Sequence, residues 1–142
     1  MTGPRVGDVH VVRRRISASM IRAFGELTAD LAAHHVSPAV ERPVAHGAYL
    51  LAALSMLGGR SALGHRITVE LMAPAYAGDV VETRIEITDV QSGGQLGVLL
   101  NADFTLRNQH GDLLGRGTVG CSLPPDPVHR PEATVQGATV GD

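Results

Sequence analysis

The sequence predicts an α+β domain in which helices form one layer and an antiparallel sheet forms the other. The order of patterns indicates this, because an extended segment and two helices come first and at least four alternating strands follow. Elements segregated in this way pack as two layers around one core. The chain has 142 residues, the size of one domain. Residues 124–142 contain four prolines by residue 131 and then small and polar residues. We interpret them as a mobile tail, so the domain is expected to span residues 1–123.

Composition excludes several classes of protein. Hydrophobic residues make up 44% of the chain and charged residues 18%, which is enough for a packed core. The formal net charge is -2 and the longest basic run is residues 13–15, which argues against a nucleic-acid partner. The single cysteine, Cys121, excludes an intrachain disulfide and a cysteine-based metal cluster. The N-terminus lacks a signal-peptide pattern and the longest apolar run is too short to cross a bilayer. We therefore expect a cytoplasmic protein without membrane contact.

The first half of the chain is expected to be helical after one extended segment. Residues 6–16 carry alternating valines typical of a strand, and Ser17 or Ser19 can cap a following helix. That helix is predicted to run to about Thr28, since apolar residues recur at helical spacing in Met20, Phe24 and Leu27. Residues 30–43 contain two prolines and little periodicity. They predict an ordered loop with at most a short helical turn.

The rest of the chain is organised around an apolar helix predicted at residues 47–57. Four leucines recur there at helical spacing, at Leu50, Leu51, Leu54 and Leu57. A helix that is apolar nearly all round is normally buried on all sides. Two glycines follow at residues 58 and 59, and glycine readily adopts the left-handed conformation that ends a helix.

The second half alternates between apolar and polar residues, the period of a half-buried strand. Four such segments begin near residues 66, 81, 98 and 113, and glycine-containing turns separate the last three. Three glycines in the last segment, at residues 115, 117 and 120, predict a bend or a close approach of two backbones.

Candidate chemistry gathers before the apolar helix. Asp30 and His35 could act as an acid–base pair, five residues apart on the loop. The helix start at Gly47 exposes backbone N–H groups that could stabilise an oxyanion. Together these groups suit proton transfer next to a carbonyl, although their spacing alone favours structural roles for the same residues. Ser55 lacks the flanking glycines of a nucleophile elbow, and the histidine spacings match no zinc signature, so no metal site is predicted.

This segment resembles the MaoC-like, (R)-specific enoyl-CoA hydratase family. That family carries a D-x-N-P-x-H motif and a later V-A-H-G that opens its central helix. Asp30 and His35 stand at the motif spacing, and residues 43–47 read Pro-Val-Ala-His-Gly. Ser55 falls where the family has a polar residue on the helix, and Gly78-Asp79 resembles its G-D turn. The resemblance extends from about residue 5 to residue 124. Two departures fall on the loop: Ala32-Ala33 replaces Asn-Pro, and the stretch between His35 and His46 is several residues shorter.

The resemblance implies a hot-dog fold, an antiparallel sheet wrapped around a long central helix, and a homodimer or dimer of dimers. It implies hydration of a trans-2-enoyl thioester, or dehydration of a 3-hydroxyacyl thioester, by Asp30 and His35. Gly47 and His46 would bind the thioester oxygen or order the helix start, and Ser55 would orient Asp30 or the water. No metal or redox cofactor is implied. Coenzyme A or an acyl carrier protein would be part of the substrate.

Three alternatives remain open. A thioesterase would direct water at the carbonyl carbon, and it would release a free thiol from a saturated acyl thioester. A non-catalytic subunit could pair with an active hot-dog partner, which the missing Asn-Pro permits. A specialised biosynthetic dehydratase or cyclase could act on a carrier-bound, polyketide-like chain, for which the shortened loop is the motive.

Overall fold

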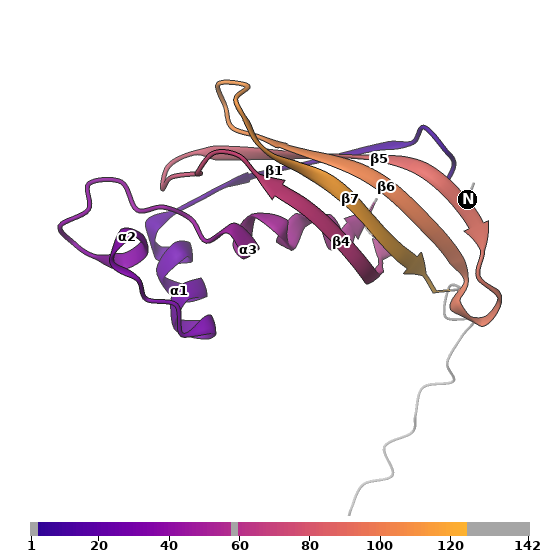
Figure 1. The fold of residues 1–142 in the computed structure, drawn as a ribbon, viewed down its shortest axis with the longest axis horizontal. Coiled ribbons are helices and arrows are strands. Elements are labelled where there is room, and N and C mark those ends of the chain that lie inside the picture. Colours follow the sequence, from indigo (N-terminus) through magenta and orange to yellow (C-terminus); the bar gives the residue numbers. More distant parts are fainter. Residues whose placement is uncertain (1–2, 58–59, 125–142) are drawn as a thin grey trace, which may run out of the picture.

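The protein forms one curved antiparallel sheet with its helical segments on one side (Figure 1). The structure is a computed structural model that describes residues 3–57 and 60–124, without the side chains of residues 53, 55–57, 60 and 61. The strand order in the sheet is β1-β5-β6-β7-β4. These strands are β1 (Val9–Arg15), β5 (Val80–Ser92), β6 (Val98–Arg107), β7 (Leu113–Leu123) and β4 (Leu63–Leu71). The two-layer α+β arrangement predicted from the sequence is confirmed.

Alternation along the strands sets which face carries the core. On β5 the residues Val81, Thr83, Ile85 and Ile87 are at most 4% exposed, as their period of two predicts. On β6 the corresponding buried residues are Leu100, Ala102, Phe104 and Leu106. The two strands are joined through the short 3₁₀ turn η2 (Gly94–Leu96), at the predicted connection.

Glycines in β7 allow the close approach of backbones that the sequence predicts. A Cβ atom on Gly117 would lie 1.8 Å from the Thr68 carbonyl oxygen of β4, far inside van der Waals contact. On Gly115 it would lie 3.0 Å from the carbonyl oxygen of Glu70. Side chains at these positions would push β4 away from β7, so the glycines permit this strand pair.

The helical layer begins with α1 (Ala18–Thr28), and the Ser17 side chain caps it by accepting a hydrogen bond from Met20 N–H at 3.2 Å. Next comes α2 (Ala33–Val36), the short helical turn expected within the loop. Next comes α3 (Gly47–Leu50), which leads into the 3₁₀ helix η1 (Leu51–Ser55) on the concave side of the sheet (Figure 1). No helix in the described part of the chain is long and apolar enough to cross a membrane.

The central helix is shorter than the sequence predicts. Only four residues are α-helical in α3, and Leu51 N–H already bonds the carbonyl of Ala48, an i→i+3 contact that tightens the helix to 3₁₀. Residues 56 and 57 then form β2 (Met56–Leu57), which pairs with β3 (Arg60–Ser61). Strand pairing thus replaces the last turn of the predicted helix. Two glycines separate these strands in the sequence, and a glycine pair between two strands also suits a hairpin. Burial is one-sided as well: Leu50 and Leu54 are buried, whereas Ala48 and Ala52 are exposed.

The predicted tail falls largely on residues 125–142, which the structure does not describe.

Cys121 is 3% exposed on the inner side of β7, and burial raises the pKa of its thiol. It is the buried small apolar residue that its position in an alternating strand predicts.

Candidate active site

Asp30 is placed at the end of α1 by an unusual turn. Ala29 has a φ of 60°, in the left-handed region, and its N–H bonds the Gly25 carbonyl. Asp30 N–H bonds the same carbonyl at 3.0 Å. Its side chain is 52% exposed, so the carboxylate is held near α1 while remaining accessible to a ligand.

His35 lies on α2 with its ring buried and one nitrogen directed at Asp30. The distance from His35 Nε2 to Asp30 Oδ2 is 3.7 Å, and the His35 side chain is 8% exposed. The other ring nitrogen, Nδ1, bonds the carbonyl oxygen of Val44. Because a carbonyl oxygen only accepts, Nδ1 must carry the proton, which leaves a lone pair on Nε2 of the neutral ring. The structure therefore brings the predicted pair within 3.7 Å and leaves Nε2, not Nδ1, facing Asp30.

His46 contacts both the Asp30 turn and the ring of His35. Its Nε2 donates to the backbone carbonyl of Asp30 at 2.9 Å, and its ring stacks on His35 with centroids 3.7 Å apart. The ring of Phe24 also lies beside the His46 ring, with centroids 5.0 Å apart. The side chain is 4% exposed, and its Nδ1 has no hydrogen-bond partner among the described residues. These contacts support the ordering role for His46 at the helix start.

Three side chains here offer metal-ligand atoms that lie within 4.8 Å of one another: Asp30, His35 and His46. His46 already uses the proton of Nε2 to bond the Asp30 carbonyl. To bind a metal with that atom it would have to move the proton to the unpartnered Nδ1. Only the Asp30 carboxylate and His35 Nε2 are free to act, which suits proton transfer better than metal ligation.

Gly25 permits the close contact between α1 and the Asp30 turn. A Cβ atom there would lie 2.7 Å from the Asp30 carbonyl oxygen and 3.4 Å from Cε1 of His46. This residue was not identified from the sequence, although a glycine inside a helical pattern is a signal of close packing.

We expect Gly25→Ala to destabilise the protein, although alanine normally favours a helix by about 1 kcal/mol over glycine. The clash involves a backbone oxygen, so the Asp30 turn must move, at a typical overpacking cost of about 1–3 kcal/mol. Urea denaturation would measure the change, with Glu26→Ala as a control on the exposed side of the same helix. A Gly25→Ala protein as stable as the wild type would contradict the requirement for glycine here.

Asp79 is at the centre of a second cluster of polar groups, and its side chain is buried. It is 3% exposed, and its carboxylate accepts hydrogen bonds from Tyr76 N–H and Gln109 Nε2, both at 2.9 Å. Arg42 Nη2 lies 3.2 Å from Oδ1. Burial by itself would raise the pKa of Asp79, but the two hydrogen bonds and the charges of Arg42 and His110 outweigh it and lower the pKa below 3.8.

A lowered carboxyl pKa predicts a pH-dependent contribution to stability. The contribution of Asp79 is complete above its unfolded-state pKa, and it disappears as the pH falls through that value towards the lower folded-state pKa. Asp79→Asn should therefore reduce the free energy of unfolding at pH 7, by about 1–3 kcal/mol, and by much less at pH 3. Urea denaturation at the two pH values measures this, with the exposed Asp103→Asn as the control. Equal losses at both pH values would exclude an ionic role.

The remaining predicted site residues differ in outcome. Gly47 begins α3 as predicted, with His46 as the N-cap. Because α3 has only four residues, the backbone N–H groups of its first turn matter more than any helix dipole. The side chain of Ser55 lies outside the described part of the structure, so its predicted role stays a prediction. His34 is exposed, as expected, yet its ring lies 3.9 Å from that of His35.

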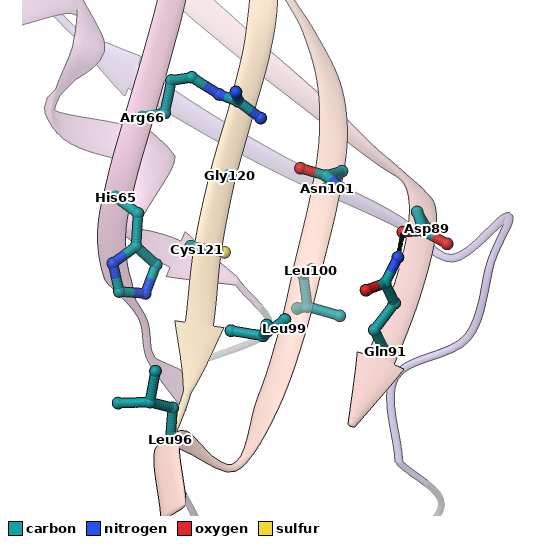
Figure 2. A pocket seen from close by; sticks show the side chains of 10 residues that line it. All are labelled: His65, Arg66, Asp89, Gln91, Leu96, Leu99, Leu100, Asn101, Gly120 and Cys121. Carbon is teal, nitrogen blue, oxygen red and sulfur yellow. Dashed lines mark hydrogen bonds between the residues drawn. The ribbon is translucent and has the colours of Figure 1, made fainter. Parts of the chain in front are cut away.

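A pocket of about 490 Å³ lies elsewhere, on β4 to β7 (Figure 2). Arg66, Asn101 and Gln91 point over its surface, and none of the acid–base residues lines it. A smaller apolar pocket of about 160 Å³ lies beside η1, lined by Leu51, Ala52, Leu54, Ala62, Gly64, Ile67, Val119 and Cys121. The acid–base residues do not line this smaller pocket either, but its apolar lining suits an apolar chain.

The chain is similar to proteins of known function and structure. No family model matches the chain. The chain is 29% identical to the (R)-specific enoyl-CoA hydratase of Aeromonas caviae over 132 residues, which covers 84% of this chain and 95% of that protein. The solved structure of an (R)-hydratase from A. caviae involved in PHA biosynthesis has a TM-score of 0.76 and 24% identity, covering 87% of this chain and 100% of the other.

A MaoC-like dehydratase from Rhodospirillum rubrum has the same fold, with a TM-score of 0.69, 20% identity, and coverage of 88% of this chain and 96% of the other. These structural similarities confirm the hot-dog fold. The chain is thus similar in sequence and in fold to MaoC-like hydratases and dehydratases.

Proposed function

We propose that this protein is a hydro-lyase that adds water to a trans-2-enoyl thioester, or removes it from a 3-hydroxyacyl thioester. One observation supports this most directly: two proton acceptors, Asp30 Oδ2 and His35 Nε2, lie 3.7 Å apart. That distance is too long for a direct hydrogen bond and short enough for one water to donate its two hydrogens to both. The named activities of the A. caviae relatives are consistent with the proposal.

In the hydration direction the pair would take one proton from the bound water as its oxygen forms a bond to C3. The electrons of the C2–C3 double bond would move towards the thioester oxygen and give an enolate. Gly47 N–H would hold that oxygen, and a proton from the pair would then return to C2, so that one water is added overall. Positioned acid–base groups contribute typically about 10²–10⁴-fold to such a step. Ser55 would help to orient Asp30 or the water.

The acyl chain would lie in the 160 Å³ apolar pocket beside η1. A cavity of about 150 Å³ accommodates a molecule the size of benzene, so this space suits a short chain. Coenzyme A or an acyl carrier protein would remain outside. We therefore expect crotonyl-CoA to react faster than an enoyl-CoA with a long saturated tail.

The test is the loss of enoyl-thioester absorbance when the protein meets crotonyl-CoA, followed beside a thiol assay with saturated butyryl-CoA. Hydration without thiol release supports the proposal. Thiol release without hydration would instead identify a thioesterase. Inactivity with both CoA substrates and with a crotonyl acyl carrier protein would favour a non-catalytic subunit.

We also propose that the active form is a homodimer built through β4. This strand is at an edge of the sheet, and exposed apolar residues lie along it and just beyond it: Leu63, Ile67, Leu71 and Met72. An exposed edge strand with apolar side chains is a ready surface for pairing with another chain. A second copy would extend the sheet and cover these side chains.

Replacing Ile67 with glutamate should weaken that dimer. Ile67 is 49% exposed in one chain, so a glutamate is tolerated there in the monomer but would be buried against a second copy. Light scattering coupled to gel filtration should give twice the 14.9 kDa chain mass for the wild type and a lower mass for the variant. Thr88→Glu, on an exposed position of β5, is the control. A wild-type mass of a single chain would exclude the dimer.

A further inference from the structure

The carbonyl that sets the protonation of His35 belongs to the segment of residues 42–46. Besides accepting from His35, Val44 donates its N–H to the His34 carbonyl at 2.9 Å. The segment pairs with residues 75–77 through two backbone hydrogen bonds of 2.8 Å, Ala45 N–H to the Ala75 carbonyl and Ala77 N–H to the Pro43 carbonyl. The position of the Val44 carbonyl therefore depends on the turn that follows residue 75.

That turn is fixed from within by Asp79. Its carboxylate accepts from Tyr76 N–H and Gln109 Nε2, while its own N–H bonds the Tyr76 carbonyl at 3.0 Å. Gln109 in turn accepts from Val80 N–H at 3.0 Å, which anchors the cluster to β5. A buried carboxylate with several hydrogen-bond donors is held in one position, because each lost bond would leave a polar group unpaired.

Arg42 connects the Asp79 carboxylate to the loop of residues 38–42. Its guanidinium donates to Asp79 Oδ1 at 3.2 Å and lies 4.5 Å from the centre of the Tyr76 ring. Among the described residues, no other hydrogen bond joins residues 38–42 to anything outside residues 37–42. Pro43 has no N–H to donate, although its carbonyl accepts from Ala77. Among the described residues of the range 38–42, the Arg42 side chain thus makes the one hydrogen bond beyond the loop, and it adds to the backbone bonds that hold residues 43–45.

We propose that Arg42 is a positioning residue: by binding Asp79 and Tyr76 it holds the Val44 carbonyl against His35 Nδ1 and so keeps the lone pair of Nε2 directed at Asp30. The expected effect of Arg42 on catalysis rests on the proposed function, whereas its effect on which nitrogen of His35 carries the proton does not. Arginine suits the position because its planar guanidinium can donate to a carboxylate and stack on an aromatic ring at once. Lysine would keep the charge and lose the planar contact.

Two readouts test this in the full-length protein. Long-range ¹H–¹⁵N spectra of the histidine side chains report which ring nitrogen carries the proton, with the His35 signals assigned from His35→Ala. Steady-state kinetics with crotonyl-CoA separate kcat from KM. The variants are Arg42→Met and Arg42→Lys, and the control is Arg13→Met. Arg42 is 57% exposed and Arg13 67%, and each is paired with a carboxylate, so all three proteins should fold.

In the wild type we expect the Nδ1–H form of His35. In Arg42→Met we expect Nε2–H signal to appear and kcat to fall by about 10- to 100-fold, with KM changed by less than about twofold. Arg42→Lys should lie between, and Arg13→Met should match the wild type. An unchanged His35 spectrum in Arg42→Met overturns the proposal, as does a change confined to KM. If the wild type hydrates no enoyl thioester, the proposed function fails and the spectra alone decide the role of Arg42.

Discussion

Asp30→Asn is expected to lower the hydration rate of crotonyl-CoA by about 10²–10⁴-fold without unfolding the protein. The amide keeps the shape of the side chain but cannot accept a proton, so His35 loses its partner in the pair. Folding should be preserved because the Asp30 side chain is 52% exposed, and its one hydrogen bond to another described residue is a long one of 3.4 Å from Ala32 N–H. Loss of enoyl-thioester absorbance measures the rate.

Glu26→Gln provides a matched control for this variant. Glu26 is an exposed carboxylate on the same helix, and it lies 3.8 Å from Arg22 instead of near a histidine. It should retain wild-type activity. If Asp30→Asn hydrates crotonyl-CoA at the wild-type rate, Asp30 takes no part in proton transfer and the proposed mechanism fails.

His35→Ala is expected to have an effect of similar size on activity, because it removes the other proton acceptor. It should also destabilise the protein, since the side chain is buried and the Val44 carbonyl would lose its donor, at a cost of about 1–3 kcal/mol. His35→Asn separates the two effects, because an asparagine amide can replace the donor function of Nδ1 but cannot accept a proton. We therefore expect it to be more stable than His35→Ala and equally inactive.

His34→Ala is the control for His35, since His34 is the exposed neighbour in the same short helix. Residues that act as a unit show strongly non-additive losses, so the double variant Asp30→Asn, His35→Ala should be little worse than either single variant. Losses that multiply in the double variant would mean that the two residues act in separate steps.

Much of the fold follows from local patterns in the sequence. Alternation on β5 and β6 identified the buried face, because each side chain of a strand points to the face opposite its neighbours. Ser17 and Ser19 both marked the start of α1, and the hydroxyl of Ser17 is the one that bonds a free N–H of the first turn. Asp30 and His35 were identified from the resemblance to a family motif, and the structure brings them together at 3.7 Å.

Other features depended on contacts between residues distant in the sequence. The apolar run after Gly47 has the spacing of a helix, but pairing of residues 56–57 with residues 60–61 ends it early. Helical periodicity alone gives no information on such pairing. The alternation near residue 66 predicted a half-buried strand, and this was wrong for β4: it is exposed on both faces except at Val69, which is partly buried. This strand lies at the edge of the sheet, where there is no further strand beside it.

Patterns in the sequence predicted the two-layer architecture and the starts of most strands, and the family resemblance singled out Asp30 and His35 as the proposed acid–base pair. Which nitrogen of His35 faces Asp30 could be read from the folded structure alone, because the acceptor that fixes it is the backbone carbonyl of Val44. The folded structure also revealed the need for Gly25 and the link from Arg42 to Asp79, across 37 residues of chain. The physical reason is common to these cases. A residue pattern reports the environment of a side chain, whereas the position of a backbone oxygen is set by the packing of whole segments.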